Sequence, residues 1–177
     1  MLKILRQIAS IGIVTESAPR ADDALRVSEA LNERVRGILG RALCIRHVDA
    51  GSCNGCELEI HALANPLYNL EGLGIRFVAS PRHADLLLVT GPVSRHMEVA
   101  LKRTYDATPE PKLVVAIGDC ACDGGIFCSQ GTDGAGGNYA TCGKVANVIP
   151  VDVVVSGCPP APTDILQGIV TAISTKK

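Results

Sequence analysis

From residue 41 onward the chain alternates short apolar runs with segments whose apolar positions recur at a helical period. The runs are continuously apolar, which is typical of strands that are buried on both faces of a parallel sheet. The predicted strands are residues 43–48, 75–79, 85–90, 112–117 and 152–155. Helices are predicted between them at about 53–64, 95–105 and 163–174. This alternation predicts an α/β domain with a doubly wound parallel sheet over residues 41–177.

Residues 1–40 have a different pattern and are predicted to form an N-terminal helical arm. Residues 21–39 repeat apolar positions near the 3.6 period and are followed by Gly40, a residue type common at helix ends. Residues 1–16 present one broad apolar face, formed by Leu2, Ile4, Leu5, Ile8 and Ile11. This arm either anchors the chain on a membrane or a partner subunit, or covers the chain's own core.

Composition narrows the class of function. The net charge of −1 and the aromatic content of 3% argue against a nucleic-acid partner, which would need a basic surface or stacking platforms. No stretch approaches the roughly 20 consecutive apolar residues of a spanning helix, so we expect no transmembrane segment. The N-terminus lacks the apolar core of a signal peptide, and a reducing compartment is therefore expected.

Eight cysteines in a reducing compartment indicate metal or redox chemistry rather than disulfides. Cys53, Cys56, Cys120 and Cys158 each follow an apolar run and lie in turns rich in Gly or Pro. Because sites in parallel sheets form beyond the carboxyl ends of the strands, these thiols can converge. Such convergence predicts an iron–sulfur cluster or a structural metal. The Cys-x-x-Cys pair alone would also fit a dithiol redox pair or half of a zinc site.

Five motifs together resemble one superfamily. They are Cys53-Asn-Gly-Cys-Glu-Leu-Glu59, Ser80-Pro-Arg-His-Ala-Asp85, Thr90-Gly-Pro-Val-Ser-Arg95, Gly118-x-Cys120 with Gly124-Gly-Ile126, and Val151-Asp152 before Gly157-Cys-Pro-Pro160. They are similar to motifs in small subunits of energy-converting (group 4, formate-hydrogenlyase-type) [NiFe]-hydrogenases. They are also similar to motifs in the homologous 20 kDa subunit family of NADH:quinone oxidoreductase. The resemblance covers roughly residues 40–175.

This resemblance implies a flavodoxin-like fold that carries one [4Fe-4S] cluster, with Cys53, Cys56, Cys120 and Cys158 as ligands. It implies an electron-transfer subunit of a hydrogenase complex, with the catalytic Ni–Fe centre in a partner, so that no catalytic residue is expected in this chain. The implied partners are a [NiFe]-hydrogenase large subunit, a ferredoxin-like iron–sulfur subunit and membrane subunits. The implied location is peripheral, on the cytoplasmic face of the cell membrane.

Two alternatives remain open. The first is the terminal-cluster, quinone-reducing subunit of a complex like NADH:quinone oxidoreductase. Its relatives resemble each other in an adjacent Cys-Cys pair, whereas this chain has Cys53-x-x-Cys56, which favours the hydrogenase branch. The second alternative is a non-catalytic zinc-binding module, which would be colourless, whereas an iron–sulfur protein is brown.

Several charged residues lie close to the predicted ligands in the sequence. Glu57 and Glu59 either favour a helix N-terminus electrostatically or contribute a proton relay between subunits. Arg82 and His83 either tune the potential of the cluster from nearby or are ordinary surface residues. The other histidines lack ligand-like spacing and are expected to be ordinary: His47, His61 and His96.

The remaining cysteines have less specific interpretations. Cys122 lies two residues from Cys120 and makes the assignment of the third ligand uncertain, although the spacing from the neighbouring glycines favours Cys120. Cys128 and Cys142 flank a Gly-rich loop predicted at 129–143 and are expected to be spectators, with pairing or extra binding as alternatives. Cys44 lies within a predicted strand and is expected to be a small core residue.

Overall fold

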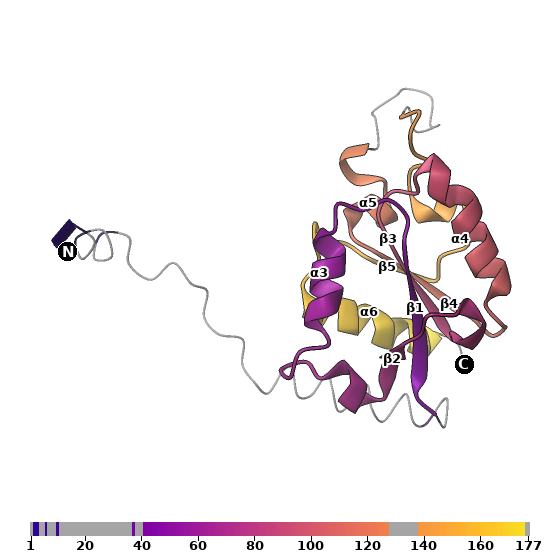
Figure 1. Cartoon of the computed structure of the whole chain (residues 1–177), viewed down its shortest axis with the longest axis horizontal. Coiled ribbons are helices and arrows are strands. Elements are labelled where there is room, and N and C mark those ends of the chain that lie inside the picture. The colour runs from indigo at the N-terminus through magenta and orange to yellow at the C-terminus, as the bar shows by residue number, and fades with distance from the viewer. Residues whose placement is uncertain are drawn as a thin grey trace.

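The computed structural model describes residues 41–127 and 138–175, together with Leu2, Lys3, Arg6, Ser10 and Gly37. Apart from those five positions, the predicted arm lies outside the described residues, as does most of the predicted Gly-rich loop. Within the described ranges five parallel strands form one sheet in the order β2-β1-β3-β4-β5 (Figure 1). This is the flavodoxin-like strand order, and it confirms the predicted doubly wound α/β fold.

Each predicted strand and helix from residue 43 onward is present, with small shifts at its ends. The strands are β1 (Leu43–Asp49), β2 (Ile75–Phe77), β3 (Leu86–Thr90), β4 (Leu113–Ile117) and β5 (Val153–Val155). The α-helices are α3 (Gly55–Ala62), α4 (Arg95–Ala107), α5 (Asp119–Cys122) and α6 (Pro162–Thr175). Short 3-10 helices are η1 (Leu70–Leu73), η2 (Pro81–His83), η3 (Gly125–Phe127) and η4 (Val145–Asn147). The sequence pattern did not predict α5 or the 3-10 helices, because four residues or fewer are too short to show a period.

The core has two layers, one on each face of the sheet. Successive strand residues point to opposite faces, and β3 is buried on both. One layer packs the sheet against α3 and α6 and includes Leu43, Ile45, Leu88, Ile117, Ile60 and Ile169. The other packs the sheet against α4 and includes Val48, Leu87, Val89, Ala116 and Leu101. Helices therefore cover both faces of the sheet, which explains why its strands are continuously apolar.

The strand register brings the carboxyl ends of four strands to the same level. Asp49 of β1 pairs with Thr90 of β3, which pairs with Ile117 of β4, which in turn pairs with Val155 of β5. The turns that follow these strands therefore leave the sheet side by side. Three of those turns, after β1, β4 and β5, lead directly to the cysteines of the predicted site.

Helix α3 begins later than the sequence pattern predicts, at Gly55 rather than near Cys53. Asn54 adopts a left-handed backbone conformation, with φ of 72°, so a right-handed helix cannot extend back through it. As a result Cys53 lies in the turn before the helix and Cys56 lies in its first turn. The two thiols are therefore presented by different local conformations.

Gly168 places the backbone of α6 close against β5. A Cβ atom at this position would lie 2.3 Å from Cγ2 of Val155, a stiff β-branched side chain. Gly→Ala inside a helix ordinarily stabilises by roughly 0.5–1 kcal/mol, but overpacking a core typically costs about 1–3 kcal/mol. We therefore expect Gly168→Ala to lower the free energy of unfolding by about 1–2 kcal/mol in urea titrations. The exposed neighbour provides a control, since Gln167→Ala should leave stability unchanged or slightly raised.

Candidate metal centre

Four cysteine thiols come together at the carboxyl edge of the sheet, and we call them the thiol quartet: Cys53, Cys56, Cys120 and Cys158. Cys53 lies in the turn after β1, Cys56 in α3, Cys120 in α5 directly after β4, and Cys158 in the turn after β5. Their proximity is visible in their electrostatics. Besides burial, electrostatic interaction with Cys53, Cys120 and Cys158 raises the pKa of the Cys56 thiol. Interaction with Cys158 and Cys53 likewise raises the pKa of the Cys120 thiol.

Glycines give the thiols room. A Cβ atom on Gly118 would lie 2.5 Å from Cys56 Sγ, so the thiol occupies the space that a side chain would fill. The φ of Gly118 is +86°, a conformation that residues with a side chain rarely adopt. A Cβ atom on Gly125 would similarly lie 3.0 Å from Cys120 Sγ. Two glycines of the predicted motifs therefore shape the pocket around the thiols.

Hydrogen bonds tie together the turns that carry Cys120 and Cys158. The amide of Asp119 donates to the carbonyl of Gly157 over 2.9 Å. The amide of Gly157 donates in return to Oδ1 of Asp119 over 2.7 Å. This reciprocal pair fixes the distance between two thiol-bearing turns that are far apart in the sequence.

Loss of the Asp119 side chain should loosen that link. In Asp119→Ala the amide of Gly157 loses a charged acceptor, a type of hydrogen bond whose removal costs about 1.5–3 kcal/mol. We expect the metal affinity of the variant to fall about 10–100-fold in a competitive chelator titration, the range seen when groups that orient metal ligands are removed. Asp106→Ala, an exposed change in α4, is the control and should keep the wild-type metal affinity. Equal affinities in the two variants would contradict a positioning role for Asp119.

The electrostatics of the quartet favour a cationic occupant. Burial raises the pKa of the Cys56 thiol to about 12, and Glu57 and the other three thiols contribute to the rise. The pKa of Cys120 is also raised, by burial and then by Cys158 and Cys53. Four thiolates cannot share this space without positive charge between them, because like charges disfavour ionisation. A bound metal would supply that charge and keep the thiols deprotonated.

The donor set fits a four-iron cluster. Four thiolates are the usual ligands of such clusters, and four thiolates can also bind zinc. Among the described residues, no three His, Cys, Asp or Glu side chains stand close enough to hold a single metal ion. A four-iron cluster spreads its ligands more widely, since each thiolate binds a separate iron atom. The absence of side chains at Gly118 and Gly125 leaves room for the thiols of Cys56 and Cys120.

The cysteines outside the quartet have other contacts. The Cys122 thiol contacts the carbonyl oxygens of Val155, at 3.4 Å, and Ala116, at 3.8 Å, which supports Cys120 as the member of the quartet. Cys142 Sγ lies 3.3 Å from Glu98 Oε2. Cys44 is 1% exposed, which confirms the prediction of a small core residue. Cys128 lies outside the described residues.

The charged residues singled out in the sequence lie in different surroundings. Glu57 is buried and Glu59 is half-buried on α3. Arg82 and His83 lie in η2, which precedes β3, whereas the quartet lies beyond the strand ends. Among the described residues no hydrogen bond or ion pair joins either side chain to the quartet, so their tuning role stays a prediction.

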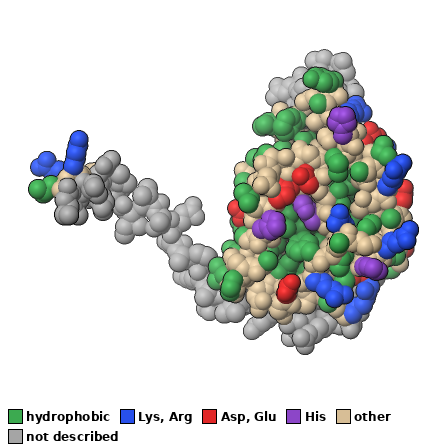
Figure 2. All heavy atoms as spheres, in the orientation of Figure 1, with side chains coloured by type: hydrophobic (Ala, Val, Ile, Leu, Met, Phe, Trp, Pro, Cys, Tyr) green, Lys and Arg blue, Asp and Glu red, His purple; other side chains and the backbone are tan. Residues whose placement is uncertain are grey.

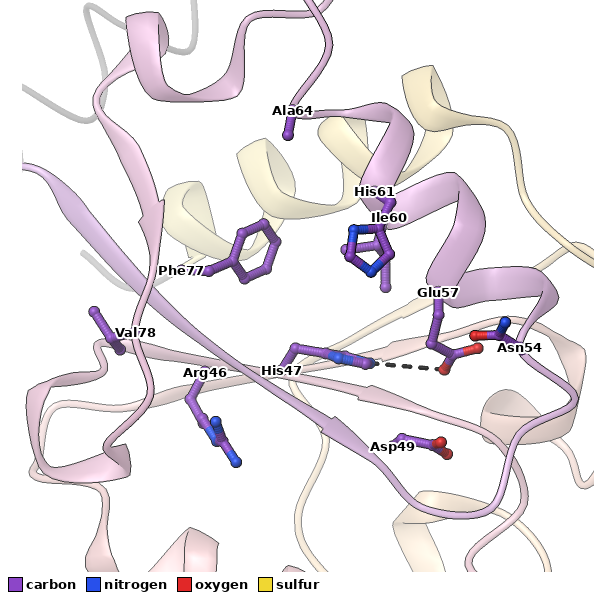
Figure 3. Close-up of a pocket in the computed structure, with 10 residues that line it drawn as sticks. All are labelled: Arg46, His47, Asp49, Asn54, Glu57, Ile60, His61, Ala64, Phe77 and Val78. Carbon is purple, nitrogen blue, oxygen red and sulfur yellow. Dashed lines mark ion pairs between the residues drawn. The ribbon is translucent and has the colours of Figure 1, made fainter.

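A pocket of about 470 Å³ lies between α3 and the end of β1, and its lining includes Asn54 and Glu57, which neighbour Cys53 and Cys56 in the sequence (Figure 3). Its walls include Glu57, Ile60 and His61 of α3, His47 and Asp49 of β1, and Phe77 and Val78 at the end of β2. The pocket exists because β2 pairs with only the first three residues of β1, and the rest of that edge of β1 is left uncovered by β2. The sequence pattern did not predict that His47 and His61 would line a pocket, although Glu57 and His61 have the i, i+4 spacing that places two side chains on one face of a helix.

The surface around the quartet is partly apolar. Cys53 and Cys158 are exposed, and Cys56 and Cys120 are half-buried. Three exposed apolar side chains follow the cysteines closely in sequence: Leu58 in α3, at 61% exposure, and Ile126 and Phe127 in η3, at 88% and 36%. Apolar side chains are visible on this part of the surface in Figure 2. Within the described ranges, no helix is both long and apolar enough to cross a membrane.

The sequence profile of the family described as "NADH ubiquinone oxidoreductase, 20 Kd subunit" matches residues 53–172. These residues include the whole quartet. The match begins at Cys53 and so leaves out the predicted N-terminal arm.

Among curated proteins, the probable membrane-bound hydrogenase subunit mbhJ of Pyrococcus furiosus is 45% identical over 76% of this chain and 76% of its own length. Formate hydrogenlyase subunit 7 of Escherichia coli K12 is 36% identical over 88% of this chain, which spans 60% of that protein. Among solved structures, a chain of the archaeal membrane-bound sulfane sulfur reductase is 31% identical, with a TM-score of 0.63. That alignment covers 84% of this chain and 78% of the other.

Proposed function

Because this chain belongs to the NADH ubiquinone oxidoreductase 20 Kd subunit family, we propose that it is the electron-transfer small subunit of a membrane-associated [NiFe]-hydrogenase. In this proposal the thiol quartet binds one [4Fe-4S] cluster. The observation that carries the proposal is the proximity of four thiols, carried by the segments that follow β1, β4 and β5, at the carboxyl edge of the sheet.

The chain's own residues would hold and insulate the bound group. Cys53, Cys56, Cys120 and Cys158 would ligate it, and Gly118 and Gly125 leave space beside two of these thiols. When bound, an iron–sulfur cluster accepts and releases single electrons at a potential set by its surroundings. The apolar strand ends beneath the quartet would keep water from its inner side.

A partner subunit is needed to cover the outer side. Cys53 and Cys158 are exposed, and so are the apolar side chains of Leu58, Ile126 and Phe127, which follow Cys56 and Cys120 closely in the sequence. Exposed apolar patches of this kind mark interaction sites. We assign this surface to the large subunit that would hold the Ni–Fe centre, which would place the two redox centres next to each other. A ferredoxin-like subunit and membrane subunits would complete a peripheral, membrane-associated assembly on the cytoplasmic face.

Hydrogenase is favoured over quinone reduction by two observations. Two similar proteins, in Pyrococcus furiosus and Escherichia coli, are named as hydrogenase and formate hydrogenlyase subunits. This chain also has the Cys53-x-x-Cys56 spacing, in which Asn54 separates the two thiols through its left-handed turn. Quinone reduction remains the second candidate, because the matching family is described by an NADH ubiquinone oxidoreductase subunit. The half-buried Glu59 is the proposed proton relay in the hydrogenase assignment.

The test is the composition and activity of the complex purified through a tag on this chain. We expect brown protein with about four irons per copy of this chain, an EPR signal on reduction, nickel in a co-purifying subunit, and H2-dependent dye reduction. A complex that contains iron but no nickel, and does not oxidise H2, would refute the hydrogenase assignment and leave quinone reduction. Colourless protein with stoichiometric zinc would refute both.

A further inference from the structure

Glu57 is a buried acidic residue whose side chain lacks a hydrogen-bond donor in the part of the chain that the structure describes. The residue is 7% exposed, and both oxygens of its side chain are buried with no hydrogen-bond partner among the described residues. A carboxylate has no hydrogen of its own to donate when ionised, so it depends on donors from its surroundings. Leaving a buried polar group without a hydrogen-bond partner is unfavourable, and more so if the group is charged. Among the described residues, no hydrogen bond therefore offsets the cost of burying the Glu57 side chain.

His47 does not donate a hydrogen bond to Glu57. Its Nε2 lies 3.7 Å from Glu57 Oε1, beyond hydrogen-bond distance, and is 3.0 Å from Oγ1 of Thr90. Burial lowers the pKa of His47, and the opposing effect of Glu57 is smaller, so the ring is neutral near pH 7. The pair is therefore a close approach of a neutral ring and a carboxylate rather than a formed salt bridge.

The carboxylate faces the pocket between α3 and β1. Figure 3 shows Glu57 directed toward His47 and the interior of the pocket, with the rings of His61 and Phe77 on its walls. Arg46 also lines the pocket, but its side chain points away from Glu57 in this view. The pocket therefore presents the Glu57 carboxyl group, without a hydrogen-bond donor among the described residues, and flat rings along its sides, while the guanidinium of Arg46 is directed elsewhere.

We propose that this pocket receives the guanidinium group of an arginine from a partner subunit. The inference rests on the proposed function to the extent that it requires an assembled complex. Two unpaired oxygens on one carboxylate match the two parallel N–H donors of a guanidinium, whereas an ammonium would engage them as a point charge. The rings of His61 and Phe77 suit a planar cation, which stacks on such faces. The exposed carboxylate of Asp49 adds a second negative charge to the pocket.

The test compares Glu57→Gln with Glu71→Gln, a matched change at an exposed acid in η1. Each tagged full-length chain is assembled with its partners, and dissociation of the complex is measured against NaCl concentration. We expect Glu57→Gln to weaken association about 30-fold or more, since breaking a buried charged pair across an interface costs at least about 2 kcal/mol. Glu71→Gln should behave as wild type.

Thermal melting of the isolated full-length chains distinguishes a hydrogen-bond donor on a partner subunit from a donor within this chain. Because neither oxygen of the Glu57 side chain has a hydrogen-bond donor among the described residues, Glu57→Gln should leave the melting temperature unchanged or raise it. A lowered melting temperature would mean that the chain itself supplies the donor, from His47 or from residues 1–40, and would overturn the proposal. Unchanged association of the Glu57→Gln complex would also overturn it.

Cross-linking identifies the chemistry of the partner group. A carbodiimide joins a carboxylate to a lysine amine but not to a guanidinium, so an amide between Glu57 and a partner lysine would contradict an arginine. Iron analysis of the same samples keeps the two hypotheses apart. A wild-type complex without iron would refute the proposed function, while the effect of Glu57→Gln on association could still be measured.

Discussion

Replacing Cys56 with alanine should abolish cluster binding and produce the largest functional loss of any single change in the chain. All three other thiols of the quartet contribute to the raised pKa of Cys56, and its Sγ packs against Gly118. Removing a group that only orients a ligand already costs about 10–100-fold in metal affinity, so loss of a ligand should cost more. We expect iron content and visible absorption to fall more than about tenfold, and electron transfer to partner subunits to cease.

The control for this experiment is a cysteine outside the quartet. Cys142 is also half-buried, but its thiol contacts Glu98. Cys142→Ala should therefore retain iron at the wild-type level. A Cys56→Ala protein with intact iron and EPR signal would show that the ligand set is wrong, and Cys122 would then be the next thiol to replace.

Gly118→Ala should have a comparable effect without removing any ligand. The added methyl group would lie 2.5 Å from Cys56 Sγ, and the φ of +86° would be strained for alanine by about 1–2 kcal/mol. The least costly relief is displacement of the Cys56 side chain, because the backbone of Gly118 is held by its hydrogen bond to Val155. We expect iron content to fall at least about tenfold, as measured by metal analysis and visible absorption.

Gly143→Ala is the control that introduces similar backbone strain without placing a methyl group against a thiol of the quartet. Its φ is +78°, close to that of Gly118, but a Cβ atom there would lie 3.1 Å from the flexible amide of Asn147. Gly143→Ala should therefore lower stability by a similar backbone cost of about 1–2 kcal/mol while iron content is maintained. Equal loss of iron in both variants would mean that global destabilisation, and not displacement of the thiol, is responsible.

The fold could be predicted because its signals are local and strong. Strands such as β3 and β4 are continuously apolar and bounded by turn residues, and the segments between them are long enough to show a helical period. The start of α3 could not be predicted, because it depends on the left-handed conformation of Asn54, for which composition gives only a weak preference. Helix α5, at four residues, is too short to leave a pattern.

The candidate site could be predicted in part. Cys53, Cys120 and Cys158 converge because they follow parallel strands that end at the same level of the sheet. The alternation of strands and helices in the sequence predicts such a parallel sheet. The spacing of the neighbouring glycines favoured Cys120 over Cys122, and the contact of the Cys122 thiol with the carbonyl of Val155 supports that preference. The Glu57 pocket could not be predicted, because it depends on where β2 stops pairing with β1.

The uneven exposure of the quartet has a consequence for maturation of the proposed complex. Cys53 and Cys158 are exposed, whereas Cys56 and Cys120 are half-buried. In the proposed assembly a docking subunit would cover the exposed side. We therefore expect cofactor loading to precede docking.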